Sequence, residues 1–109
     1  MHDFDSYTTI KLKINEDYYD LWVADSNEKK SLGLSGIDYL PEKTGMIFTY
    51  DKPATGSFTM RETSIPLTII FLDNRGNTVY QKKCEPYQRE LINPGVQYSY
   101  VIEIWIWMK

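Results

Sequence analysis

The feature of this sequence that most limits its fold is a side-chain period of two, which recurs along most of the chain. Between Thr8 and Ile14, isoleucine and leucine alternate with threonine and lysine, as in a strand with one buried face. The alternation resumes from Tyr18 to Ala24, after the turn residues at 15–17. This period favours a β fold over a helical bundle, whose apolar residues would repeat every 3.6 positions.

Further strands are predicted where apolar and β-branched runs end at Gly, Pro, Asn or Asp. They cover Gly45–Tyr50, Ser57–Arg61, Leu67–Leu72, Thr78–Cys84 and Tyr98–Met108. One short helix is predicted from the capping pattern of Asp25 and Glu28 to the glycines at 33 and 36. We therefore expect one domain over residues 1–109, mainly β: a small barrel-like, mostly antiparallel rolled sheet of about seven strands.

Composition narrows the function before any motif is considered. The 109 residues include twelve Lys and Arg and fifteen Asp and Glu, and the resulting net charge of −3 argues against a nucleic-acid partner. His2 and Cys84 are the only histidine and cysteine, so we expect no disulfide, no metal site, no cofactor and no histidine-based catalyst. We also expect no membrane span, and the cytoplasm is the default location because the chain begins without an export signal.

The polar residues of segment 58–73 form the first candidate site. Pro66 predicts a bend, because proline cannot donate to a sheet ladder, and a bend would aim Arg61, Glu62 and Thr63 into one pocket. There Arg61 would hold a carboxylate or phosphate, and Glu62 would accept hydrogen bonds from hydroxyl or amine groups. The alternative is a regular strand that turns Arg61 and Glu62 to opposite faces as ordinary surface charges.

Two more carboxyl groups, those of Asp73 and Glu103, join the candidates. Asp73 ends the strand that follows the bend, whereas Glu103 lies within the apolar strand predicted at 98–108. Burying a carboxylate alone is costly, so Glu103 needs either an ion pair, with Arg61 or Arg89, or a ligand contact.

The same C-terminal strand predicts a surface. Ile102, Ile104 and Ile106 share one face; Val101, Glu103, Trp105 and Trp107 share the other. If the isoleucines fill the interior, the two indoles lie outside and would form a ligand platform or a protein interface. The alternative is that the helix or the loop at 85–97 covers them.

An ordered set of short motifs runs through the middle of the chain. It consists of Ala24-Asp-Ser-Asn-Glu28, Gly33-Leu34, Leu40-Pro41, Gly45-Met-Ile-Phe48, Phe58-Thr-Met60 with Thr63, Ile65-Pro-Leu67, Ile69-Ile-Phe71, Asp73 and Gly76. Over roughly residues 23–104 this set resembles the domain of unknown function 192, a bacterial and archaeal family. The resemblance implies a small β-barrel-like fold with one or two short helices and no established reaction. It also implies that many relatives are exported, with suggested links to the cell envelope or sugar transport.

The sequence departs from the family pattern at the candidate site. Where the family usually has Trp-Met-Lys-Asn-Thr, residues 59–63 are Thr-Met-Arg-Glu-Thr, and where it continues Pro-Leu-Asp this chain has Pro-Leu-Thr at 66–68. An amide and a carboxylate of the pattern have thus become Glu62 and Thr68. A site at this position is built from different groups.

These observations predict a non-enzymatic binding module for a sugar or another small polar molecule. The ligand-binding candidates are Met60, Arg61, Glu62, Thr63, Asp73 and Glu103. One alternative is a structural or partner-docking protein that forms a homodimer through its C-terminal strand, with Trp105 and Trp107 at the interface. Another is a hydrolase that uses Glu62, Asp73 or Glu103.

Overall fold

The computed structural model describes residues 2–105, and the alternating segments form strands in it. The elements are η1 (Phe4–Ser6, a 3₁₀ helix), β1 (Thr9–Ile14), β2 (Asp17–Ala24), α1 (Asn27–Leu32), β3 (Thr44–Ala54), β4 (Leu67–Leu72), β5 (Thr78–Cys84) and β6 (Tyr98–Trp105). Within this part of the chain, no helix is long and apolar enough to cross a membrane.

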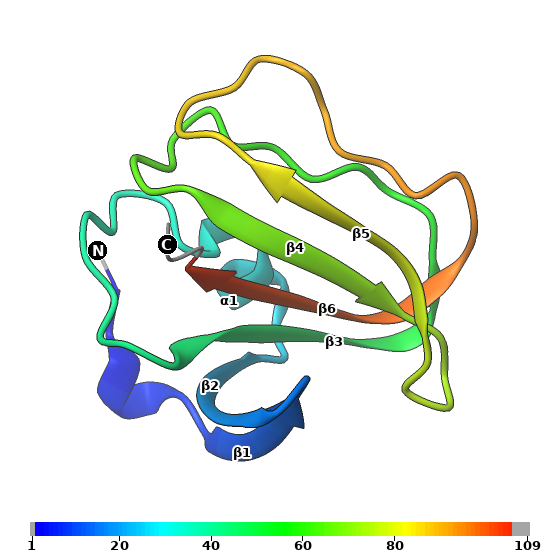
Figure 1. Cartoon of the computed structure of the whole chain (residues 1–109), viewed down its shortest axis with the longest axis horizontal. Helices are drawn as coiled ribbons and strands as arrows, with labels where there is room; N and C mark the ends of the chain where they lie inside the picture. The colour runs from blue at the N-terminus through cyan, green and yellow to red at the C-terminus, as the bar shows by residue number, and fades with distance from the viewer. Residues whose placement is uncertain (1, 106–109) are drawn as a thin grey trace.

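The strands form one sheet in the order β1-β2-β3-β6-β4-β5 (Figure 1). All neighbours run antiparallel except β2 and β3, whose parallel pairing follows from the crossover through α1. The predicted mainly β, mostly antiparallel sheet is confirmed. Within residues 2–105 the sheet has six strands rather than seven, and it is open, with β1 and β5 as its edges.

The strand predicted at 57–61 is wrong. Phe58 forms only an isolated bridge with Ile92, and residues 61 and 62 lie in a turn. This turn is closed by the Thr63 amide, which donates to the Met60 carbonyl at 3.1 Å, and the Thr59 hydroxyl accepts from the Arg61 amide. The segment is therefore a loop, and it sends the buried Met60 side chain into the core.

Both faces of the sheet are buried at its centre. The larger core cluster contains side chains of β2, β3, β4 and β6 together with loop residues that cover them, among them Leu34, Leu40, Met60, Ile65 and Ile92. The smaller cluster contains Leu21, Ile47, Ile70, Leu72, Ile102 and Ile104. The alternation predicted for the C-terminal strand is confirmed up to residue 105, because Ile102 and Ile104 share one face, but Val101 on the opposite face lies in the larger core. Ile106 and the rest of the predicted strand to Met108 lie outside the described residues.

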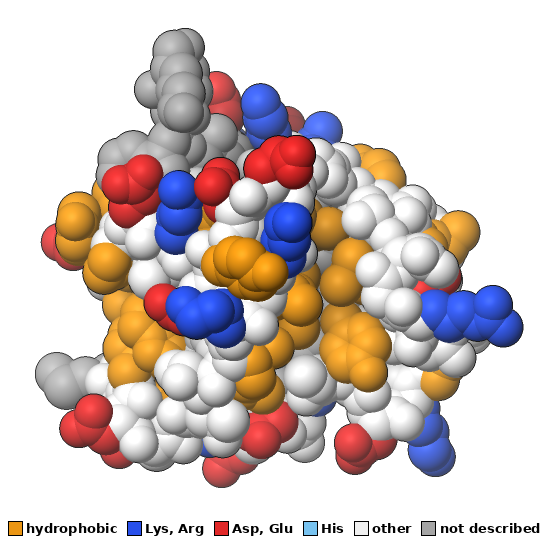
Figure 2. All heavy atoms as spheres, turned by 60° about the horizontal axis from the view of Figure 1, so that its bottom comes forward, with side chains coloured by type: hydrophobic (Ala, Val, Ile, Leu, Met, Phe, Trp, Pro, Cys, Tyr) orange, Lys and Arg blue, Asp and Glu red, His pale blue; other side chains and the backbone are white. Residues whose placement is uncertain are grey.

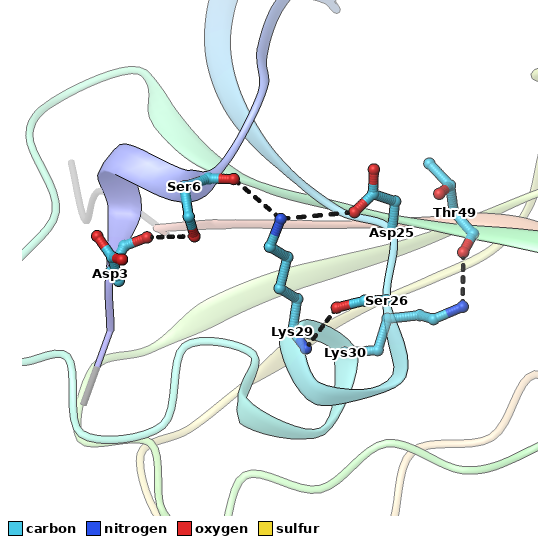
Figure 3. Close-up of polar contacts among 7 residues, drawn as sticks. All are labelled: Asp3, Ser6, Asp25, Ser26, Lys29, Lys30 and Thr49. Carbon is cyan, nitrogen blue, oxygen red and sulfur yellow. Dashed lines mark hydrogen bonds and ion pairs between the residues drawn. The ribbon is translucent and has the colours of Figure 1, made fainter.

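Helix α1 is held at three places (Figure 3). Ser26 caps its first turn by accepting a hydrogen bond from the Lys29 amide, so the cap is Ser26 rather than the predicted Asp25. The Lys29 ammonium donates to the Ser6 carbonyl at 3.0 Å and lies 3.7 Å from the Asp25 carboxylate. The Lys30 ammonium donates to the Thr49 carbonyl, in the middle of β3, at 2.8 Å, which ties the helix to that strand.

Candidate functional site

A pocket of about 340 Å³ lies between α1, the end of β3 and the loop at 56–59. Residues from four parts of the chain line it: Lys30 and Ser31 of α1, Phe48 and Tyr50 of β3, Phe58, Thr59 and Thr63 of the segment between β3 and β4, and Tyr98 and Glu103 of β6. Its size is at the lower end of the range typical of small-molecule sites. We call it the Glu103 pocket.

Glu103 is the one acidic residue among the described residues that line this pocket. Its side chain is on the core face of β6, and only 5% of the residue is exposed. The backbone positions it firmly, because it pairs with Met46 on one side and Ile69 on the other. A carboxyl group is thus carried into the interior by a central strand.

The carboxyl group of Glu103 forms no hydrogen bond or ion pair within residues 2–105. Of the two alternatives expected from the sequence, the ion pair with Arg61 or Arg89 therefore does not occur there, and the ligand contact stays a prediction. Every fully enclosed side-chain nitrogen or oxygen in this part of the chain has a partner, so the Glu103 oxygens must open onto the pocket. Burial raises the pKa of this carboxyl to about 8, because the charged form loses its hydration.

Aromatic rings form the walls around this carboxyl group. Phe48 and Phe58 pack edge to face with ring centroids 5.1 Å apart, and Tyr50 and Tyr98 do so at 5.5 Å. The Tyr98 hydroxyl donates to the Gly56 carbonyl at 2.7 Å, which fixes the loop against β6. Burial raises the pKa of both tyrosines, so their hydroxyls stay neutral around physiological pH.

Lys30 supplies the pocket's positive charge. Its ammonium, besides donating to Thr49, lies 4.3 Å from the centroid of the Tyr50 ring. It forms no ion pair with Glu103. The Lys30 ammonium and the Glu103 carboxyl group are therefore not paired with each other.

The structure brings two of the predicted site residues together, Thr63 and Glu103, which both line the pocket. Met60 is fully buried in the larger core cluster and serves packing. Arg61 and Glu62 are exposed, and neither lines the pocket. Because they lie in a turn, they do not alternate across a strand as the surface-charge alternative predicted.

Asp73 lies away from this pocket, at the turn between β4 and β5. Its carboxylate accepts hydrogen bonds from the backbone amides of Arg75 and Asn77, both at 2.9 Å. The Asn77 amide, followed by the Arg75 amide and side-chain contacts, lowers the pKa of Asp73. These contacts are those of a residue that closes a hairpin.

Trp105 is half-buried, packs against the larger core cluster, and meets Tyr39 edge to face at 5.5 Å. Part of it stays accessible, because it also lines the hollow of about 460 Å³ described next, and its place at an interface stays a prediction. Trp107 falls outside the described residues. Strand β6 lies between β3 and β4, so its backbone from 98 to 105 offers no open edge for a second copy of the chain.

A second hollow, which was not predicted from the sequence, lies on the opposite face of the sheet. It measures about 460 Å³, and Leu12, Ile14, Tyr19, Ile70, Ile102 and Ile104 provide much of its lining, with Thr68, Gln81 and Lys83. The sequence feature that could have indicated this hollow is that both faces of β6 carry apolar residues. Figure 2 shows that hydrophobic side chains on the face it presents are interrupted by charged ones.

The positions of the acidic residues also bear on metal binding. No group of three His, Cys, Asp or Glu side chains that could hold a metal ion occurs within residues 2–105. Cys84, the free thiol, is buried, and burial raises its pKa to about 11.

Two solved structures resemble this fold. One is a protein of unknown function from Novosphingobium aromaticivorans DSM 12444, with a TM-score of 0.78, 24% identity, and coverage of 91% of this chain and 73% of that chain. The other is a proposed transcription regulator from Sinorhizobium meliloti 1021, with a TM-score of 0.77, 21% identity, and coverage of 92% and 82%. At these identities the likeness concerns the fold alone.

Sequence comparison identifies the family. A search of curated proteins finds no match for this chain. The family model of the domain of unknown function 192, described as "Uncharacterized ACR", matches residues 10–105. This span covers the strands from the second residue of β1 to the end of β6, and every residue named above as lining the Glu103 pocket. The chain belongs to the domain of unknown function 192 family.

Proposed function

We propose that this protein is a binding module for a small polar molecule and that the Glu103 pocket is its binding site. The observation that carries the proposal is the carboxyl group of Glu103, which is buried, lacks a partner within residues 2–105, and lines a hollow of about 340 Å³. A buried polar group without a partner costs free energy, and a ligand that donates hydrogen bonds to it recovers that cost.

The walls suit a ligand with an apolar side. Phe48, Phe58 and the two tyrosines supply aromatic surface close to the carboxyl group. Ligand sites typically combine mostly apolar walls with a few polar groups that orient the bound molecule. Sugars and other small molecules with one apolar and one hydrogen-bonding side fit this combination.

Binding is favoured over hydrolysis by the number of carboxyl groups. Glycoside hydrolysis ordinarily uses two, at a defined separation. Glu62 and Asp73 do not line the Glu103 pocket, so it has a single carboxyl group among the described residues. One carboxyl group can orient a ligand, but it lacks the second partner of that reaction.

A thermal-shift screen followed by calorimetry tests the proposal. The screen covers sugars, polyols, amines, nucleotides and common metabolites on the full chain. Each compound that raises the melting temperature is then titrated into the protein and into Glu103→Gln, with Asp73→Asn as the matched acid-to-amide control outside the pocket. We expect at least tenfold weaker binding to Glu103→Gln and unchanged binding to Asp73→Asn.

A second variant blocks the pocket without touching the carboxyl group. Ser31 is an exposed residue of α1 that lines the pocket, so Ser31→Trp should fill the entrance. We expect this variant to fold and to lose binding. The proposal is wrong if no compound stabilises the protein, or if the compounds that do bind both variants as tightly as the unmodified chain.

A further inference from the structure

We infer that the ligand of the Glu103 pocket carries a protonated amine, whose ammonium group binds the Glu103 carboxylate between the rings of Phe58, Tyr50 and Tyr98. This inference rests on the proposed function and names the class of its ligand. It follows from three features of the pocket: the acid at its base, the aromatic walls, and the way the walls already hold a cation.

The acid requires a donor. A carboxyl group that is 5% exposed and has no partner within residues 2–105 gains most from a partner of opposite charge, because a charged hydrogen bond is about twice as strong as a neutral one. A neutral hydroxyl can hydrogen-bond to the protonated acid, but it gives no electrostatic stabilisation to the carboxylate form. An ammonium group would supply both hydrogen bonds and charge.

The walls favour the same ligand. Aromatic faces attract cations through the negative potential above the ring, and the attraction grows when water is excluded. Two phenylalanines and two tyrosines line the pocket that holds the carboxyl group. An acid surrounded by rings is the combination that recognises organic ammonium ions.

The protein itself provides an example of the contact. The Lys30 ammonium lies 4.3 Å from the Tyr50 ring centroid, and its hydrogen bond to Thr49 holds it there. Because Lys30 forms no ion pair with Glu103, it leaves the carboxyl group available. Its positive charge should weaken the binding of a second cation somewhat, and removing that charge should strengthen it.

The amine class has a pH signature. Four titratable groups lie around the Glu103 carboxyl group: Lys30 of α1, Tyr50 of β3, Tyr98 of β6 and Cys84 of β5. Burial raises the pKa values of both tyrosines and of Cys84, so these groups are neutral between pH 6 and 8. The pKa of Glu103 is about 8, so the free protein holds a proton there that an ammonium ligand must displace.

Matched pairs of ligands test the inference. The probes are isopentylamine, cyclohexylamine and phenethylamine, each with the alcohol of the same skeleton, titrated calorimetrically between pH 6 and 8. We expect at least one amine to bind ten or more times tighter than its alcohol, with affinity rising by up to tenfold per pH unit. Titration at pH 7 in phosphate and in Tris should show release of about one proton per amine bound.

Two variants separate this inference from its alternatives. Glu103→Gln should abolish the preference for the amine and the release of the proton. Lys30→Met should bind the amine at least as tightly as the unmodified chain. The inference is overturned if amine and alcohol bind alike, if amine binding is independent of pH, or if Lys30→Met loses the amine as Glu103→Gln does. If only neutral sugars bind in the pocket, the inference of an amine ligand is wrong and the proposed function is not affected. If no compound binds, both the inference and the proposed function are wrong.

Discussion

Glu103 is an ionisable residue at a position of the fold that favours an apolar side chain. It occupies an interior strand, with Met46 and Ile69 as its neighbours in the sheet, where a hydrocarbon side chain would stabilise the core more. Its carboxyl group is protonated over most of the physiological range because burial raises its pKa to about 8. Burial in the core favours the neutral acid over the carboxylate. A cation bound next to Glu103 would favour the carboxylate.

This pKa predicts how stability depends on pH. The ordinary pKa of the carboxyl is 4.5 and the folded value is about 8, so the unfolded chain releases this proton first. The stability contributed by protonated Glu103 is complete below about pH 4.5 and is lost as the pH rises through 8, at no more than about 1.4 kcal/mol per pH unit. Glu103→Gln cannot ionise. Its free energy of unfolding should therefore rise relative to the unmodified chain between pH 5 and 8, as measured by urea denaturation.

The control for this prediction is Asp73→Asn. The pKa of Asp73 is lowered by the backbone amides of Asn77 and Arg75, so its contribution is complete above the unfolded value and disappears only as the pH falls. Between pH 5 and 8 the difference between Asp73→Asn and the unmodified chain should be constant. A constant difference for Glu103→Gln over the same range would contradict the assignment of the raised pKa.

At the scale of elements, the contact between β3 and β6 fixes the base of the pocket. Gly45 pairs with Ile104, next to the position where Met46 pairs with Glu103. A Cβ atom at Gly45 would overlap the Glu103 carbonyl oxygen and come within 2.9 Å of the Ile104 side chain. The absence of a side chain at 45 therefore allows the two strands to approach closely.

We expect Gly45→Ala to destabilise the fold by on the order of 1–3 kcal/mol, because the overlap falls on backbone atoms that cannot rotate away. The measurement is urea unfolding at pH 6. Gly56→Ala is the matched control, since a Cβ there would meet only the Tyr98 hydroxyl at an ordinary 3.8 Å. Equal stability of the two variants would show that β3 can shift away from β6.

At the scale of the whole molecule, the last strand in the sequence is an inner strand of the sheet. Strand β6 separates β3 from β4, and it contributes to both core clusters, through Val101 on one face and Ile102 on the other. The β1–β2–β3 part and the β4–β5 hairpin are joined in the sheet only through β6. Completion of the sheet therefore depends on a strand at the end of the chain, a non-local arrangement.

Deletion of residues 98–109 should leave the chain without cooperative unfolding, because β3 and β4 lose their shared partner and both cores open. Near-ultraviolet circular dichroism and urea denaturation measure this. Deletion of residues 1–6 is the control: it removes η1 and the stacking of Phe4 on Trp22 but no strand, so this chain should fold with reduced stability. A cooperative transition in the first deletion would contradict the central role of β6.

Much of the secondary structure was determined by the sequence itself. The strands at 67–72 and 78–84 have the predicted bounds, and the helix ends near its predicted glycine, because alternation, turn residues and a positive-φ glycine at 33 act within a few positions. The sequence also predicted which side chains of β6 share a face of the sheet, because this depends only on their alternation along the strand. The family was also readable from the order of short motifs along the chain.

The tertiary structure alone decided which of those elements meet. It placed Thr63 beside Glu103 in a pocket, left Arg61 and Glu62 in an exposed turn, and made β6 an inner strand buried on both faces. The reason is physical: the direction of a side chain follows from the backbone beside it, whereas its burial and its partners depend on segments dozens of residues away. The chain thus specified a carboxyl group on an apolar strand, and only the packing of α1 and the loop at 56–59 made it the base of a pocket.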